Sequence, residues 1–352
     1  MGQMGFFDLS QRYERLDDKG DPLPLLAKLV PWEDFRPKLK AVLEAQGLRM
    51  PPAERRSAAG RKPWDEVLMF KALVLQALYN LSDEQTEYQI RDRLSFMRFL
   101  ALGLEDRVPD ATTLWLYREA LANAGMVEKL FAVFDAHLQA QGYQASGGQI
   151  IDASIVPAPR QRNTREENAA IKAGDMPPGW TANPAKLHQK DLDARWTQKN
   201  GRSQYGYKNH ISIDRTHKFV RRYTVTDAAQ HDSRAFEEVL DCNNSSADVW
   251  ADSAYRSAEA DAMLKEYGLR NHLHRRATRG HKLSERQRAA NTVRSRVRAR
   301  VEHVFGHQTT AMGAKLVRTI GLARARMKIG MMNLAYNISR LACLHRLAAN
   351  SA

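Results

Sequence analysis

Hydrophobic and polar residues alternate in two different ways along this chain, and the change falls near residue 148. Before residue 148, apolar residues recur every three or four positions, which is the spacing of an amphipathic helix. Ser82 and Asp110 stand where a side-chain oxygen accepts hydrogen bonds from the first amides of a helix, and the helix after Ser82 is predicted to run past Phe96. We therefore expect an all-helical N-terminal domain over residues 1–147.

After residue 148 the pattern predicts strands that alternate with helices. Strands are expected at residues 150–156, 205–213, 218–226, 249–251 and 270–274. Helices are expected at residues 232–240, 257–267, from 284 past 302, and at 323–348. Three strands followed by helix, strand, helix, strand and helix is the order of a ribonuclease-H-like α/β fold, with a mixed five-stranded sheet flanked by helices.

The expected domain limits follow from this order of elements. The catalytic core is placed at residues 148–310, and a C-terminal helical region at 311–352 is expected to pack on it. Residues 157–204 interrupt the core with little periodicity, and this insertion is too long for an ordinary loop. We therefore expect the insertion to be functional or partly disordered.

The net charge of this 352-residue chain is +14 and its pI is about 9.8. An excess of cations favours a polyanionic partner, because neutralising phosphates releases their counterions. A basic protein without such a partner remains the alternative at this point. The hydrophobic fraction of 43% is ordinary for a globular protein with a sizeable core.

The compartment is indicated by what the sequence lacks. Cys242 and Cys343 form no CxxC pair, which argues against a disulfide framework and a cysteine zinc site. No apolar run approaches the roughly 20 residues of a membrane span, and the first residues do not resemble a signal peptide. We expect a cytoplasmic bacterial protein, associated with the nucleoid and without a membrane partner.

Three carboxylates are candidate catalytic residues. Asp152 lies in the first predicted strand, Asp252 directly follows the fourth, and Glu302 lies on the long basic helix. In this fold the first and fourth strands are adjacent and parallel, so the two aspartates would lie side by side. Crowded carboxylates are unfavourable without a cation, and hard oxygen ligands suit Mg²⁺ or Mn²⁺. The pattern predicts a site for two such ions, which promote in-line phosphoryl transfer.

A basic segment precedes Glu302. Residues 270–300 contain eleven Lys or Arg and one acidic residue, Glu285. Arg298 is four residues before Glu302, on the same helix face, where it would orient Glu302 or contact the scissile strand. His272 and His274 are interpreted as structural. The candidate DNA-binding residues are Lys208, His210, Arg294, Arg298, Arg300 and Arg318.

Several segments together resemble the DDE transposases of bacterial insertion sequences, in particular the insertion sequence five family. Residues 61–76 and 108–114 are similar to the helical N-terminal domain of that family. The segments similar to its catalytic core are 151–156 (IDASIV), 205–210 (YGYKNH), 251–255 (ADSAY) and 298–305 (RARVEHVF). Some relatives have a Tyr three residues before the arginine and a Lys seven after the glutamate. Ser295 and Thr309 occupy those positions here, so those two roles do not carry over directly, and Lys315 or Arg318 is a candidate substitute.

The resemblance implies a transposase with Asp152, Asp252 and Glu302 as catalytic and metal-binding residues and Arg298 as a fourth catalytic residue. Its expected partners are double-stranded DNA, as terminal inverted repeats and as target, and a second copy of the chain in a homodimer on DNA. The N-terminal helices would form a helix-turn-helix-like DNA-binding module, or a plain bundle for packing or dimerisation. Two alternatives remain: a ribonuclease-H-like nuclease without strand transfer, and a catalytically inactive DNA-binding regulator.

Overall fold

The computed structural model describes residues 8–48, 62–199, 201–277 and 280–350. Contacts within the chain divide it into two compact units, Met1–His137 with Leu334–Ala352, and Leu138–Asn333. The helices α8 (Met126–Ala140) and α14 (Leu322–Ala349) each have residues in both units. The domain limits expected from the sequence stay a prediction. Within the described ranges, no helix is both long and apolar enough to cross a membrane.

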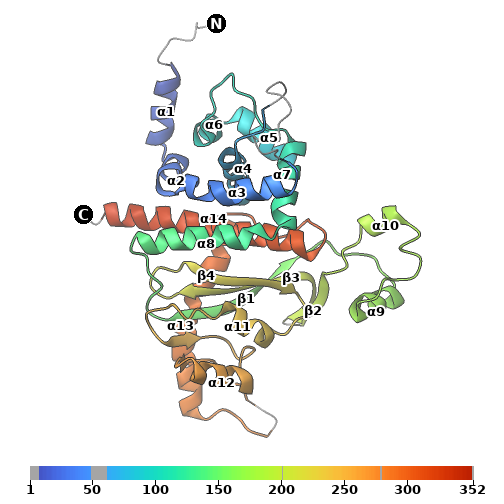
Figure 1. Cartoon of the computed structure of the whole chain (residues 1–352). Helices are drawn as coiled ribbons and strands as arrows, with labels where there is room; N and C mark the ends of the chain where they lie inside the picture. Colours follow the sequence, from blue (N-terminus) through green and yellow to red (C-terminus); the bar gives the residue numbers. More distant parts are fainter. Residues whose placement is uncertain (1–7, 49–61, 200, 278–279, 351–352) are drawn as a thin grey trace. The chain divides into compact units, whose positions relative to one another are not determined.

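The described elements of the first unit are all helical, as predicted (Figure 1). Besides parts of α8 and α14, they are α1 (Asp8–Asp18), α2 (Leu23–Leu29), α3 (Trp32–Ala45), α4 (Glu66–Tyr79), α5 (Asp83–Asp92), α6 (Leu94–Leu100) and α7 (Ala111–Asn123). The predicted caps are confirmed, because Ser82 accepts from the Gln85 amide and Asp110 from the Thr113 amide. The single helix expected through Phe96 is wrong: Arg93 adopts an extended conformation (φ −103°, ψ 115°) and separates α5 from α6.

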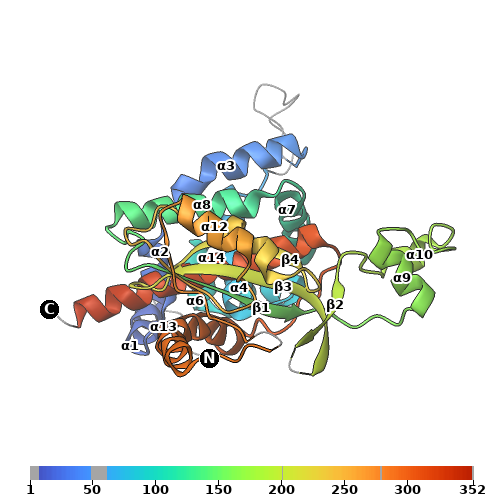
Figure 2. The same ribbon diagram turned by 90° about the horizontal axis from the view of Figure 1, so that it is seen from below.

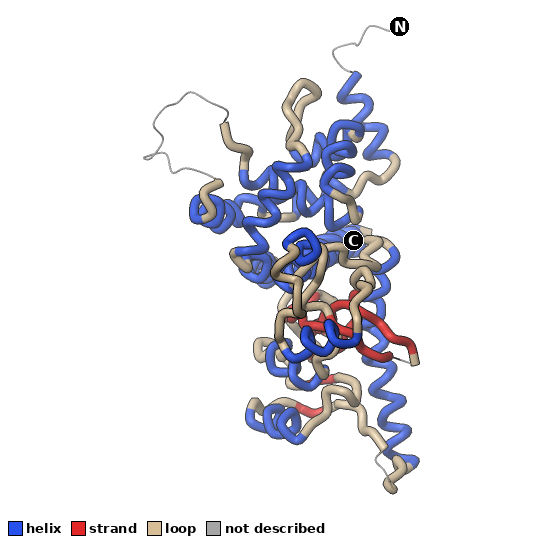
Figure 3. The backbone as a smooth tube through the Cα atoms, turned by 90° about the vertical axis from the view of Figure 1, so that its right-hand side faces the viewer, coloured by secondary structure: helices blue, strands red, loops and turns tan. Residues whose placement is uncertain are grey.

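The second unit contains the sheet. Its strands are β1 (Gln149–Pro157), β2 (Arg195–Lys199), β3 (Arg202–Asp214), β4 (Val220–Asp227), β5 (Asp248–Trp250) and β6 (Arg270–Asn271). Its helices, besides parts of α8 and α14, are α9 (Arg165–Ala173), α10 (Pro184–His188), the 3-10 turn η2 (Asp232–Ala235), α11 (Phe236–Val239), α12 (Ala258–Glu266) and α13 (Glu285–Thr310). Figure 3 shows the strands with helices on both sides.

The strand order confirms the predicted ribonuclease-H-like α/β fold. The sheet runs β2-β3-β1-β5-β6, and β4 also pairs with β3. Strand β1 is antiparallel to β3 over nine residue pairs and parallel to β5, and β5 is parallel to β6. The expected number of five strands is wrong, because the described part of the sheet has six. The additional strand, β2, comes from within the insertion.

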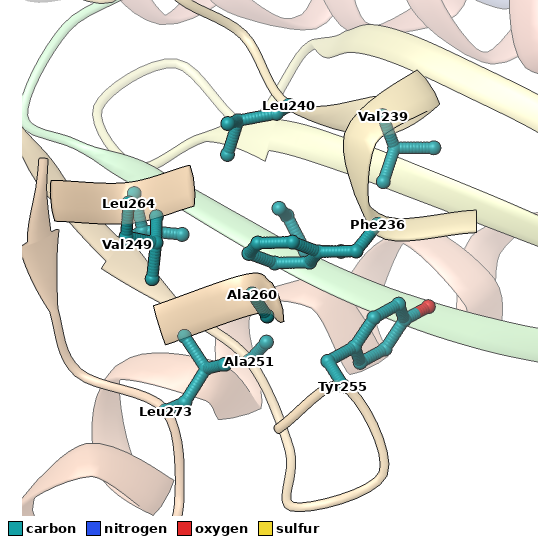
Figure 4. Close-up of a cluster of buried hydrophobic side chains, with 10 residues drawn as sticks. Phe236, Val239, Leu240, Val249, Ala251, Tyr255, Ala260, Leu264 and Leu273 are labelled. Carbon is teal, nitrogen blue, oxygen red and sulfur yellow. The ribbon is translucent and has the colours of Figure 1, made fainter. Parts of the chain in front are cut away.

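The two faces of the sheet carry different helices (Figure 2). Side chains alternate along a strand, so Ile151 and Asp152 of β1 point to opposite faces. Ile151 joins an apolar cluster that helices α11 and α12 cover (Figure 4). Its members are Ile151, Phe236, Val239, Leu240, Val249, Ala251, Tyr255, Ala260, Leu264 and Leu273. Asp152 lies on the other face, where α13 contacts it through Arg298.

Gly148, immediately before β1, allows β1 and β5 to approach each other. Its φ is +90°, a conformation that residues with a Cβ rarely adopt. A Cβ there would lie 2.5 Å from Cζ3 of Trp250 and 2.7 Å from the Asp248 carbonyl oxygen. A larger residue would therefore separate the two strands that carry the aspartates.

Phe236 is central to the apolar cluster, and its replacement tests the energetic account of the fold. Phe236→Ala leaves a cavity in the cluster that contains Ile151 and Ala251 and is expected to lower the free energy of unfolding by about 3–5 kcal/mol. Urea denaturation followed by circular dichroism measures this loss. The control is Tyr267→Ala, because Tyr267 is 47% exposed and its loss should cost less than about 0.5 kcal/mol. Equal effects of the two substitutions would contradict the assignment of this cluster as the core.

Candidate active site

Asp152 and Asp252 lie at the corresponding ends of two adjacent strands. Ile150 of β1 pairs with Trp250 of β5 in parallel register, and each aspartate follows two residues later. Equal spacing from a paired position places both carboxylates at the same edge and on the same side of the sheet. Burial raises the pKa of Asp152, and the negative charge of the nearby Asp252 adds to the increase. The sequence prediction that these two residues lie together agrees with this geometry.

The Asp152 carboxylate is largely buried and accepts two hydrogen bonds. One oxygen, Oδ1, accepts from the Ala153 amide at 2.8 Å, and Oδ2 accepts from Nη2 of Arg298 at 3.0 Å. Burial raises the pKa of Asp152 above its usual value of 3.8, and the charge of Arg298 offsets part of this increase. Since the net shift is upward, the charge of Arg298 does not fully offset the effect of burial on this carboxylate.

Asp252 begins a short turn that packs on the apolar cluster. Its Oδ1 accepts from the Ala254 amide at 2.9 Å, and the fully buried ring of Tyr255 anchors the turn in the apolar cluster. The Tyr255 hydroxyl lies 3.1 Å from Nδ1 of His210 on β3. Burial raises the pKa of Tyr255 far above its usual range, and the charges of Asp232, Asp152 and Asp252 add to the effect. Tyr255 is therefore a neutral phenol beside the carboxylates.

The hydrogen bonds of His210 fix its tautomer. Thr226 donates its hydroxyl proton to the Asp227 carbonyl oxygen, so its oxygen accepts from Nε2 of His210 at 3.0 Å. Nδ1 of His210 is then unprotonated and accepts from the Tyr255 hydroxyl. Burial lowers the pKa of His210 to about 4, so the neutral ring ties β3 and β4 to the turn that carries Asp252.

Two expected DNA-binding residues lie inside the fold. His210 is completely buried by the contacts just described. Lys208 donates to the Gln230 carbonyl at 2.7 Å and pairs with Asp232 at 2.8 Å, with only 12% of its side chain exposed. Contacts with Asp232 of η2 and with Tyr255 enclose the two side chains. Their expected contact with DNA stays a prediction.

Arg298 connects α13 to the site. Besides donating to Asp152, its Nη1 lies 3.4 Å from Nδ1 of His274, while its Nε is buried and has no hydrogen-bond partner. Helix α13 begins at the predicted residue, because the Ser284 and Gln287 side chains form a capping box in which each accepts from the other's backbone amide.

His274 lies at the site, although the sequence suggested only a structural role for it. Its amide donates to the Ala251 carbonyl at 3.1 Å, which extends the pairing of β5 with β6 toward Asp252. Burial lowers the pKa of His274, as does the nearby charge of Arg298. The sequence does hold a signal for His274 at the site. His274 comes shortly after β6, as Asp252 comes shortly after β5. His272 instead stacks on Trp250 and bonds Asp248 at 2.8 Å, which suits a structural role.

Glu302 lies one helical turn beyond Arg298, on the same side of α13. Its neighbours Val301 and Val304 are buried, and Glu302 is exposed. Across the residues that the structure describes, no three His, Cys, Asp or Glu side chains lie close enough together to hold a metal ion. The structure therefore brings together Asp152, Asp252 and Arg298, and it does not gather Glu302 with them.

The other basic candidates divide into anchored and exposed residues. Arg294 donates to the Leu273 carbonyl at 3.2 Å, and burial lowers the pKa of Arg294. Arg300 donates to the Arg215 carbonyl at 2.8 Å. Arg318 is exposed, and so is Lys315. Arg294 and Arg300 hold α13 against the sheet, whereas Arg318 presents its charge to solvent.

Two family models match this chain. A family model described as "Transposase DDE domain" matches residues 144–338, more than half of the chain, and one described as "Transposase domain (DUF772)" matches residues 10–120. The solved structure titled "Cryo-EM structure of piggyBac transposase synaptic complex with hairpin DNA (SNHP)" is similar at 13% identity. That similarity covers 94% of this chain and 76% of the other, with a TM-score of 0.45.

The lowered pKa of His210 predicts a specific dependence of stability on pH. The folded protein binds this proton less tightly than the unfolded chain, whose histidine pKa is about 6.5. The contribution of His210 is therefore complete above pH 6.5 and is lost as the pH falls toward 4, by about 3 kcal/mol in all. His210→Gln keeps a donor and an acceptor without titrating, so its free energy of unfolding should fall less over this interval. Parallel urea titrations from pH 7 to pH 4 compare the two proteins, and identical slopes would contradict the assignment.

Proposed function

Because this chain belongs to the DDE transposase family, we propose that it cleaves DNA at the ends of an insertion sequence and joins the resulting 3′-hydroxyls to target DNA. The observation that carries the proposal is the pair Asp152 and Asp252 at the ends of adjacent parallel strands. A transposase acts on DNA, and the net charge of +14 suits that polyanion. The proposed specific substrate is the terminal inverted repeat of its own element, within the insertion sequence five group that the motifs resemble.

The residues present fit divalent cations. Asp152 and Asp252 offer hard oxygen donors, and a bound cation would stabilise the charged form of Asp152, whose pKa burial raises. Asp152, Asp252 and Glu302 are the proposed ligands of two Mg²⁺ or Mn²⁺ ions. Such ions, when bound, activate an attacking hydroxyl and stabilise a leaving oxygen. Glu302 is proposed as the third ligand because it is exposed one turn from Arg298, which contacts Asp152.

Arg298 is proposed to position the Asp152 carboxylate. Its guanidinium holds Oδ2 while the Ala153 amide holds Oδ1, so the carboxylate has a defined orientation. The Arg298 side chain is 17% exposed beside the site. A phosphate oxygen of the scissile strand is the proposed acceptor for the exposed part of its guanidinium, since guanidinium groups bind phosphate well.

The DNA surface is proposed to follow the basic side of α13 and the segment after it. Arg318 supplies exposed charge, while Arg294 and Arg300 contribute charge from fixed positions. The N-terminal helices are proposed to bind DNA or to hold two protomers together. A homodimer on DNA follows from the reaction, because both ends of an element must be processed together.

Strand transfer tests the proposal directly. A pre-cleaved terminal-repeat duplex, a target plasmid and Mg²⁺ are incubated with wild-type protein or with Asp252→Asn. Loss of one carboxylate ligand should reduce joining by at least about a hundredfold, while binding of the duplex in a mobility-shift assay stays within about twofold. Asp261→Asn is the matched control, because Asp261 lies on α12 and pairs with Arg256 outside the site; it should join like the wild type.

Each other outcome identifies an alternative. Joining by Asp252→Asn at the wild-type rate would remove Asp252 from the catalytic set. Cleavage of an uncut repeat without joining would identify a nuclease that lacks strand transfer. Binding without any reaction by the wild type would identify a DNA-binding regulator.

A further inference from the structure

The insertion between β1 and β3 adds a two-stranded edge to the sheet. Strand β2 pairs with the first part of β3, from Arg195 opposite Gly206 to Lys199 opposite Arg202. Figure 1 shows this pair at the end of the sheet from which α9 and α10 extend. The catalytic proposal makes no use of this edge.

Trp196 on β2 is a large aromatic residue that the fold leaves exposed. It lies opposite Tyr205 in the register, and the two ring centroids are 5.2 Å apart at an angle of 46°. Tyr205 is buried, yet 41% of Trp196 is exposed. The guanidinium carbon of Arg160 lies 5.6 Å from the centroid of the Trp196 ring. The result is an exposed indole with a cation beside it.

The charge around Trp196 is one-sided. Residues 195–206 contain Arg195, Lys199 and Arg202 and no acidic residue. Arg160, Lys199 and Arg202 are exposed, and Nη2 of Arg160 donates to the Ser203 carbonyl at 3.4 Å. This edge is therefore complementary to a polyanion.

The nearest acidic residues of the insertion are already engaged. Both carboxylate oxygens of Asp191 accept from the Tyr207 hydroxyl, at 2.9 and 2.7 Å. Oδ2 of Asp193 accepts from the Leu322 amide at 2.8 Å. Glu167 accepts from Nε1 of the buried Trp180 and from Lys186. The Asp191 bonds attach the insertion to β3 and the Asp193 bond attaches it to the start of α14, so Trp196 has a defined position.

That position relates Trp196 to the active site. Tyr205, opposite Trp196, is six residues from Ile211, which lies opposite Asp152. Directly opposed residues share a face of an antiparallel pair, so the register places Trp196 and Asp152 on the same face. Six residues of strand span about 20 Å.

We propose that Trp196 and Arg160 form a binding site for single-stranded DNA, in which the indole stacks on an unpaired base and Arg160 contacts the adjacent phosphate. Exposed aromatic rings among basic residues bind single strands because every base has a stacking face. The proposal rests on the proposed action on DNA for the identity of the ligand. Its test measures binding without divalent ions, so it does not depend on strand transfer.

The probe is a fluorescently labelled 15-residue oligothymidylate in EDTA, compared by anisotropy with a labelled duplex of the same length. Trp196→Ala should weaken single-strand binding by about tenfold and change duplex binding by less than twofold. Trp196→Phe keeps an aromatic ring on β2 and should retain most of the affinity. Tyr267→Ala is the control, because Tyr267 follows α12, is an aromatic residue that is 47% exposed and lies outside the proposed DNA-binding residues; it should bind like the wild type.

The remaining outcomes overturn the proposal. They are wild-type protein that does not bind the oligothymidylate, a Trp196→Ala variant with unchanged affinity, and equal losses for single strand and duplex. Equal losses would mean that Trp196 supports the fold of the hairpin and nothing more. Thermal unfolding of each variant accompanies the titrations, and a Trp196→Phe variant that is folded yet binds as poorly as Trp196→Ala would also contradict stacking.

Discussion

The parallel pairing of β1 with β5 is the constraint on which the site depends. Only two residue pairs join these strands, and the apolar cluster beneath them keeps the short contact in place. Ile151 and Ala251 point into that cluster, so the next residue of each strand must point away from it. The next residues are Asp152 and Asp252. Burial of apolar side chains on one face thus holds two carboxylates together on the other, and the favourable free energy of that burial offsets their repulsion.

Neighbouring side chains hold the two aspartates in place and partly offset their negative charge. Arg298 neutralises part of it from α13, and Tyr255 with neutral His210 holds the turn of Asp252 without adding a charge. The pKa of Asp152 is still raised, so the fold tolerates an electrostatic cost at this edge. Such a cost is common at sites that bind a cation, because the bound cation supplies the positive charge that the protein lacks. In the proposed function, this cost serves the binding of cations for phosphoryl transfer.

Much of the fold could be predicted from local sequence patterns, and the failures have specific causes. The starts of α5, α7 and α13 follow from Ser82, Asp110 and Ser284, because a cap depends on residues within one turn. Strand β2 could not be predicted, since its pairing with β3 is the main reason that it is a strand. The break at Arg93 has no Pro or Gly to signal it. At the site, the proximity of Asp152 and Asp252 could be predicted from the order of the strands. The burial of Lys208 and His210 could not, because it depends on η2 and α11, which lie elsewhere in the sequence.

The proposed metal ligands can be located by iron-mediated cleavage of the polypeptide. Fe²⁺ replaces Mg²⁺ at oxygen-rich sites, and hydroxyl radicals formed there cut the backbone nearby. The protein, bound to a terminal-repeat duplex, is treated with Fe²⁺, ascorbate and peroxide, and the fragments are identified by mass spectrometry. The account predicts cuts close to residues 152, 252 and 302 that excess Mg²⁺ suppresses and that Asp252→Asn abolishes. Cuts near 152 and 252 without one near 302 would remove Glu302 from the ligand set, and the absence of cuts at all three would contradict the central claim.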